Sequence, residues 1–203
     1  MSLRRSACEQ HMDRIMSEHD APNNGPESAQ DQWNEENLIA EPPHPVNWNL
    51  LASHDLEQEL LELNRWVNWL RLEYGLPASV IPPLWHRHPE LLWELSALHL
   101  HWLCAYDANQ DGSAPLGWHR DFADARQRLR DWVSASGTRL DRDRPTRLTI
   151  WPGEDHTVEI VEQVITDRDA DFVQFVVDQV QTREVAEDAF YASIDDHAGE
   201  VPN

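Results

Sequence analysis

The sequence predicts a mainly α fold, with a three-helix core and a small α+β C-terminal part. Three observations predict this fold class. Apolar residues recur every three or four positions over 55–74, 89–106 and 115–135, which is the period of amphipathic helices. Proline, glycine and aspartate separate these segments from one another. Strand-like, β-branched sequence is confined to two short segments nearer the C-terminus.

The first helix is expected at 55–74, with Ser53 as its N-cap and Gly75 at its C-terminal end. Its apolar face comprises Leu56, Leu60, Leu63, Val67, Leu70 and Tyr74. Trp66 and Trp69 lie off this face, as Trp93 does in the following helix. Because tryptophan is enriched at protein interfaces, these three residues are the candidates for contact with a partner.

The second helix is expected at 89–106, with Pro89 at the first helical position, where its missing N–H costs nothing. Its broad apolar face includes Leu91, Leu95, Leu98 and Trp102, and Leu100 and Cys104 lie on the opposite side. A helix that is apolar on two sides must be buried, either at the centre of the protein or against a partner. His99 lies on the broad face and is predicted to be a core histidine with one hydrogen-bond partner.

The third helix is expected at 115–135, on the stripe formed by Trp118, Phe122, Ala125 and Leu129. An Arg/Asp linker follows at 138–147. Arg147–Trp151 and Thr157–Val164 are predicted to pair as a hairpin. Two further helices are expected, at 169–181 with an aspartate cap at Asp167 or Asp169, and at 183–194.

The chain is divided by composition into four parts. Residues 1–47 are rich in Pro, Asn, Gln and acidic residues and are predicted to be a disordered acidic arm. Residues 48–137 form the predicted helical core domain, and 138–194 a small acidic α+β extension. Residues 195–203 are predicted to be a disordered tail.

The formal net charge of −21 is unevenly distributed, at −6 over 1–54, −3 over 55–148 and −12 over 149–203. Such a field opposes contact with nucleic-acid phosphates and anionic membranes, so neither is expected as a direct partner. All 16 fixed side-chain cations are arginine, which excludes a lysine Schiff base and a P-loop lysine. Two distant cysteines and no apolar run of membrane-spanning length indicate a cytoplasmic protein.

The segment before the second helix contains several polar residues of the types that bind metals or act in catalysis. Trp85 and Arg87 are given structural roles, and Arg87 is expected to pair with a nearby carboxylate and fix the turn. The alternative interpretation is a metal-dependent enzyme, whose ligands would be His86, His88, Glu94 and His119. No dinucleotide-binding, Walker, zinc-protease or EF-hand motif occurs, so no catalytic residue and no cofactor are assigned.

Leu84-Trp85-His86-Arg87-His88-Pro89-Glu90-Leu91, followed by Glu94-Leu95-Ser96-Ala97-Leu98, resembles a group of small uncharacterised actinobacterial proteins. Trp118-His119 and the Phe-Val-x-Phe-Val sequence at 172–176 are similar to the later Trp-His pair and C-terminal helix of that group. The resemblance covers about residues 80–180. It implies an accessory role associated with mobile elements, and it carries over no catalytic residue.

The sequence therefore favours a non-enzymatic accessory or adaptor protein that acts through protein–protein contacts, including contact with a second copy of itself. Two alternatives stay open at this point. One is the metal-dependent enzyme, and the other is an acidic nucleic-acid mimic that binds a basic protein.

Overall fold

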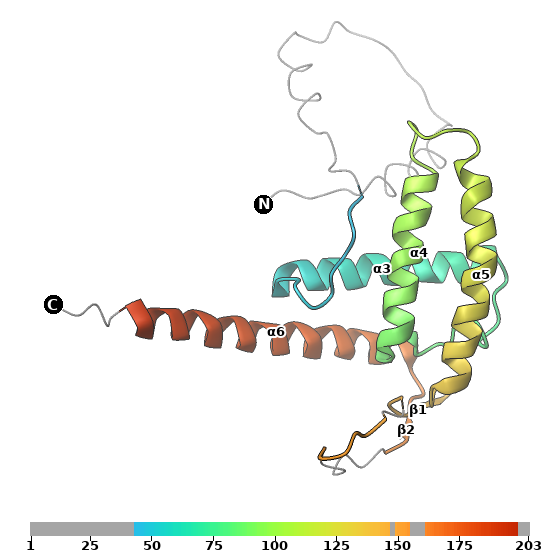
Figure 1. The fold of residues 1–203 in the computed structure, drawn as a ribbon. Helices are drawn as coiled ribbons and strands as arrows, with labels where there is room; N and C mark the ends of the chain where they lie inside the picture. The colour runs from blue at the N-terminus through green and yellow to red at the C-terminus, as the bar shows by residue number, and fades with distance from the viewer. Residues whose placement is uncertain (1–42, 147–148, 155–160, 199–203) are drawn as a thin grey trace, which may run out of the picture.

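The computed structural model describes residues 43–146, 149–154 and 161–198. Over these residues the fold is mainly helical, as predicted, with a small antiparallel sheet near the C-terminal part (Figure 1). The four helices are α3 (Ser53–Glu73), α4 (Pro89–Ala105), α5 (Ala114–Ala135) and α6 (Arg168–Ala198). One 3-10 turn, η1 (Trp85–Arg87), precedes α4, and the strands are β1 (Arg142–Asp143) and β2 (Gln163–Val164). Residues 1–42 of the arm predicted at 1–47 lie outside this description, as do the last five residues of the tail predicted at 195–203.

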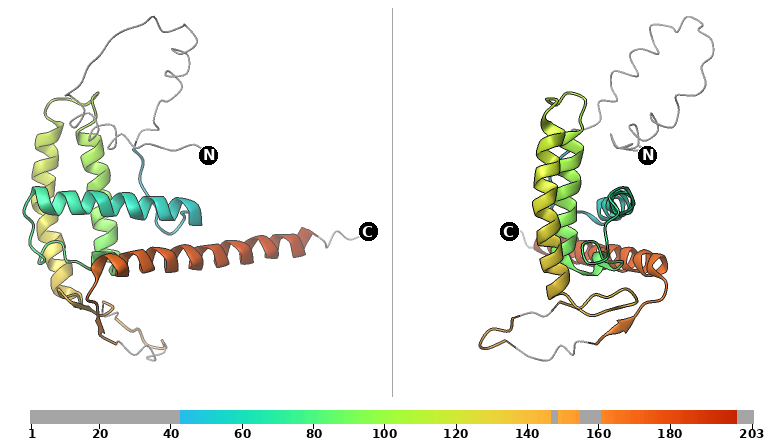
Figure 2. Two further views of the ribbon diagram at one scale, coloured as in Figure 1. Left: turned by 180° about the vertical axis from the view of Figure 1, so that it is seen from behind. Right: turned by 90° about the vertical axis from the view of Figure 1, so that its right-hand side faces the viewer.

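Helices α4 and α5 stand side by side as an antiparallel pair, and α3 crosses them (Figures 1 and 2). Helix α6 runs beside α3 in the opposite direction and extends past the end of α3 that begins at Ser53. The two strands lie below the N-terminal end of α4, next to the start of α6. One end of α6 is thus enclosed by the protein, and the other end protrudes.

The core contains the faces that helical periodicity predicts. Buried positions on α3, α4 and α5 include Leu60, Leu63, Leu70, Leu91, Leu95, Trp118 and Leu129. Phe172 and Val176 of α6 join the same buried cluster, so a fourth helix completes the predicted three-helix core. The segment 138–194 and the helices before it therefore share one hydrophobic core.

The start of α3 depends on a contact from a distant part of the chain. The N-cap position belongs to Ala52, so the prediction of Ser53 as the cap is wrong. The carboxylate of Glu187 in α6 accepts hydrogen bonds from the backbone N–H and the hydroxyl of Ser53, both at 2.9 Å. Glu187 thereby satisfies a donor that a helix start leaves without an intrahelical partner.

Replacement of Glu187 by alanine is expected to destabilise the protein by about 1 kcal/mol, the usual effect of losing a cap. Amide hydrogen exchange should then accelerate in the first turn of α3. Glu184→Ala is the matched control, because it removes a carboxylate from the same helix and leaves the bonds to Ser53 intact. Equal acceleration in both variants would contradict a capping role for Glu187.

The C-terminal strands differ from the predicted hairpin. Strand β1 lies within the predicted linker, and Arg142 pairs with Val164 and Asp143 with Gln163. Residues 149–151 belong to no strand, and 147–148 and 155–160 lie outside the described residues. The pairing follows tertiary contacts and not β propensity, since His88 binds Asp143 at 2.7 Å and Arg142 lies 3.3 Å from Glu162.

The two helices expected after residue 168 are one continuous helix, with no break at 182. No glycine or proline occurs between Arg168 and Ala198 to end the helix. The hydroxyl of Thr182 donates to the carbonyl of Asp178 at 2.7 Å, so its polar group is satisfied within the helix. The predicted cap at Asp167 is confirmed, because its carboxylate accepts from the backbone N–H groups of Asp169 and Ala170.

Candidate functional site

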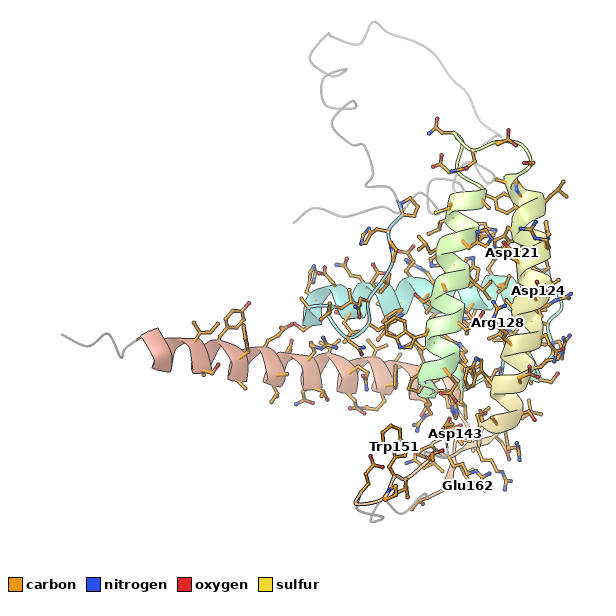
Figure 3. All side chains as sticks on the ribbon, in the orientation of Figure 1. Asp121, Asp124, Arg128, Asp143, Trp151 and Glu162 are labelled. Carbon is orange, nitrogen blue, oxygen red and sulfur yellow. The ribbon has the colours of Figure 1, made fainter. Side chains whose placement is uncertain are left out.

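A polar cluster, buried at His86, His88 and Asp143, joins the segment before α4 to the strands and to the start of α6. We call this cluster the junction, and it comprises His86, Arg87, His88, Glu90, Asp143, Thr146, Gln163 and Asp171. Asp143 lies just below the N-terminal end of α4 (Figure 3). The junction contains two of the four predicted metal ligands, so its geometry bears directly on the enzyme hypothesis.

Arg87 forms the predicted pair with a carboxylate, and its partner is Asp171 of α6. Nε of Arg87 donates to one carboxylate oxygen of Asp171 at 2.9 Å, and a terminal nitrogen donates to the other at 2.5 Å. Burial alone would raise the pKa of Asp171, but hydrogen bonds from Arg87 and His86 outweigh burial and lower it. Arg87 also donates to Gln163 of β2 at 3.0 Å, so one side chain fixes two distant segments.

His86 is a neutral histidine inside the junction. Its side chain has no exposed surface, and burial lowers its pKa to about 4 against the opposing effect of the hydrogen bond with Asp171. In this neutral form Nε2 donates to Asp171 at 2.8 Å, while Nδ1 is buried without a hydrogen-bond partner. The ring packs edge-on against Phe172 and also contacts Phe175, so it contributes to the packing of α6 as well as to the polar network.

His88 connects α4 to the segment that contains β1. Thr146 donates its hydroxyl proton to Glu90 at 2.6 Å, so its oxygen accepts from Nδ1 of His88 at 2.9 Å. Nε2 of His88 lies 2.7 Å from the carboxylate of Asp143. Both ring nitrogens of His88 therefore face acceptors, which leaves neither nitrogen available to a substrate.

The contacts of the junction have a structural role, and its two imidazoles are not accessible to a substrate. The side chains of His86 and His88 are completely buried. The shallow pocket at Arg139–Arg142 and Glu162 and the groove between α3 and α6 are both lined by residues outside the junction. A general base must reach the proton that it abstracts, and these imidazoles cannot do so in this arrangement.

The four predicted metal ligands are not brought together. His86 and His88 bind different aspartates, Glu94 pairs with Arg128 at 2.6 Å, and His119 lies 3.3 Å from the hydroxyl of Tyr106. Within the part of the chain that the structure describes, no group of three or more His, Cys, Asp or Glu is placed to hold a metal ion. This arrangement therefore does not bring His86, His88, Glu94 and His119 together as one ligand set.

The three candidate interface tryptophans have different environments. Trp66 is only 3% exposed and packs on His99 with ring centroids 4.9 Å apart, so it belongs to the core and is not available to a partner. Trp69 is half-buried against Trp102, at 5.0 Å between centroids. Trp93 is 40% exposed, and its role in an interface stays a prediction.

His99 is buried in the core, as predicted, but the expected hydrogen bond at Nε2 is missing. This atom is buried without a partner, and the nearest carboxylate oxygen, on Glu62, is 3.9 Å away. Burial lowers the pKa of His99 to about 4, so the ring is neutral at pH 7. His99 therefore acts as an aromatic core residue whose charged form the fold disfavours.

The protruding end of α6 is the surface that the sequence analysis missed. The face of α6 that packs on α3 continues beyond Glu187, where α3 has ended. Phe190, Tyr191 and Ile194 lie on this continuation and are 61%, 65% and 47% exposed. We call these three residues the distal stripe. The helix predicted at 183–194 contains all three residues, but the sequence does not show that α3 begins only at Ser53 and leaves this end of α6 uncovered.

The fold and these surfaces define a mainly α-helical protein with a buried structural junction and one exposed helix end. Comparisons with models of known protein families, with curated proteins and with solved structures gave no match. None of the helices in residues 43–146, 149–154 and 161–198 is long and apolar enough to span a membrane.

Proposed function

We propose that this protein is a non-enzymatic adaptor that binds another protein through the protruding end of α6. The observation that carries this proposal is the exposure of the distal stripe, in which three large apolar side chains are clustered on one helix face. Clustered aromatic and aliphatic side chains on a surface are typical of protein interaction sites.

The rest of α6 is fixed in a way that supports this role. Asp171 is held by Arg87 and His86 at the start of the helix. Arg183 donates to the backbone carbonyls of Trp48, Asn49 and Leu51, at 3.0, 2.9 and 2.8 Å. Together with the bond between Glu187 and Ser53, these contacts fix α6 up to Glu187, three residues before the stripe. A surface held in place before binding loses less conformational entropy when a partner docks.

Site-specific photocrosslinking tests this proposal in the native host. A photoreactive phenylalanine analogue is placed at position 190 or 194, and as a matched control at position 185. Val185 is also apolar and 65% exposed, but it lies on the opposite side of α6 from the stripe. We expect positions 190 and 194 to yield the same crosslinked partner, and position 185 not to yield it.

The same partner should be lost from position 190 when Tyr191 and Ile194 are both replaced by serine. The melting temperature should stay unchanged, because both side chains are exposed. Crosslinking of equal strength from positions 185 and 190, or crosslinking insensitive to the serine replacements, would refute the adaptor role of this surface.

A further inference from the structure

We infer that the occupant of the exposed α6 face is a basic amphipathic helix of the partner protein, laid along α6. This inference rests on the proposed function and specifies the chemistry of the partner. It depends on two observations, which are the spacing of the exposed positions along α6 and the sign of the charges around them.

Positions along one side of α6 follow a seven-residue repeat. Val173, Val177, Val180, Glu184, Glu187, Tyr191 and Ile194 succeed one another at alternating intervals of four and three residues. This is the spacing by which one helix presents a continuous face to another helix. Five of these positions are exposed, whereas Val180 packs against the core and Glu187 is half-buried where it binds Ser53. From Val173 to Ile194 the face is about 32 Å long, which a partner helix of roughly 20 residues would cover.

A groove beside this face can accommodate apolar side chains of a partner. The groove has a volume of about 420 Å³ and lies between α3 and α6. Its lining comprises Glu57 of α3 and Val176, Val177, Val180, Gln181 and Glu184 of α6. Three of these lining residues are valines and two are glutamates. The groove therefore matches a helix with apolar residues on one side and cations beside them.

The charges select a basic partner. From Glu184 to Ile194, α6 carries three acids and no arginine or lysine, and Asp195 and Asp196 follow in the sequence. The only two arginines after residue 148 are Arg168 and Arg183, and both are engaged with other parts of the protein. An acidic partner would meet like charge along the part of the face after Arg183, whereas arginine or lysine would pair with these carboxylates.

The same argument disfavours two other occupants. A second copy of the chain would bring a net charge of −21 and an identical acidic helix end. Residues 1–42, which precede the described part of the chain, contain nine acids and three arginines, a formal net charge of −6. Both occupants are acidic overall, so a separate basic protein fits the face best.

Two synthetic peptides test the inference on the full-length protein. Both are 21-residue helices with leucine at the seven-residue repeat, and the flanking positions are arginine in one peptide and glutamate in the other. Fluorescence anisotropy at 150 mM salt should detect binding of the arginine peptide only. Replacement of Tyr191 and Ile194 by serine should weaken binding at least about tenfold, since two large apolar contacts are lost.

Charge and control variants complete the design. Glu184→Gln should weaken the arginine peptide by about threefold and reduce the dependence of its affinity on salt. Val185→Ser should leave affinity unchanged. Equal binding of both peptides, or an equal effect of Val185→Ser, would overturn the inference. Sedimentation that reveals a dimer broken by Ile194→Ser would also overturn it, in favour of a second copy.

The failure of this inference is distinguishable from the failure of the proposed function. If positions 190 and 194 crosslink to a partner whose contact segment is not basic, the adaptor role stands and the inference fails. If these positions give no specific crosslink, the adaptor role itself fails.

Discussion

Lowering the pH from 7 to 4.5 is expected to remove about 5 kcal/mol from the free energy of unfolding. His86 and His99 are buried in neutral form with pKa values of about 4, against 6.5 when solvated. Between these values the unfolded chain binds protons that the folded protein does not, so stability is lost as the pH falls through this window. At pH 4.5 each histidine contributes roughly 2 to 3 kcal/mol to this loss.

Urea unfolding at several pH values between 4.5 and 7 measures this dependence. The matched control is the double variant His86→Gln/His99→Phe, in which neither position titrates. Glutamine retains a donor for Asp171, and phenylalanine retains the ring that packs on Trp66. The double variant should lose most of the slope in this pH range. An unchanged slope would mean that other groups determine the acid sensitivity.

Replacement of Asp171 by asparagine is expected to cost about 3 kcal/mol, within the range for breaking a buried ion pair. The change leaves Arg87 without its counter-charge and replaces one of the two acceptor oxygens shared by Arg87 and His86 with an NH2 donor. The contacts of Arg87 and His86 are what attach the first turn of α6 to η1. Hydrogen exchange should therefore accelerate along α6 before it accelerates in α4 and α5.

The control for this variant is Asp178→Asn on the same helix. Asp178 is exposed, and its carboxylate accepts from Gln174 within α6, so the change should cost less than about 0.5 kcal/mol. A double-mutant cycle with Arg87→Leu then isolates the pair itself. If Asp171→Asn costs the same in the Arg87→Leu background, the pairing with Arg87 contributes nothing to stability.

Local sequence patterns predict the parts of this fold that depend on local periodicity. Helices α3, α4 and α5 are examples, because apolar residues recur at helical spacing over several turns of each. Each of these helices is also followed by a glycine or by a loop. Trp66 was misassigned because α3 packs against α4 on one side and α6 on another. A single apolar face per helix is too simple a rule for a helix between two neighbours.

Contacts between segments far apart in the chain could not be predicted from the sequence. The pattern around Arg87 indicates that it needs a carboxylate, but Asp171 is one of 37 acidic residues and lies 84 positions away. The same limit applies to β1, whose two residues carry no strand signal and are positioned by the contacts of Asp143 with His88 and of Arg142 with Glu162. For the related reason, the sequence could not show that His86, His88 and His119 each contact a different partner in the fold.

The bond between Glu187 and Ser53 has a consequence for the order of folding during synthesis. The two residues are 134 positions apart, so α3 leaves the ribosome long before the carboxylate that completes its first turn. Helices α4 and α5 are joined by a short loop and can associate early, because closing a short loop costs little entropy. The nascent chain therefore reaches its final stability only after α6 has been translated and has docked.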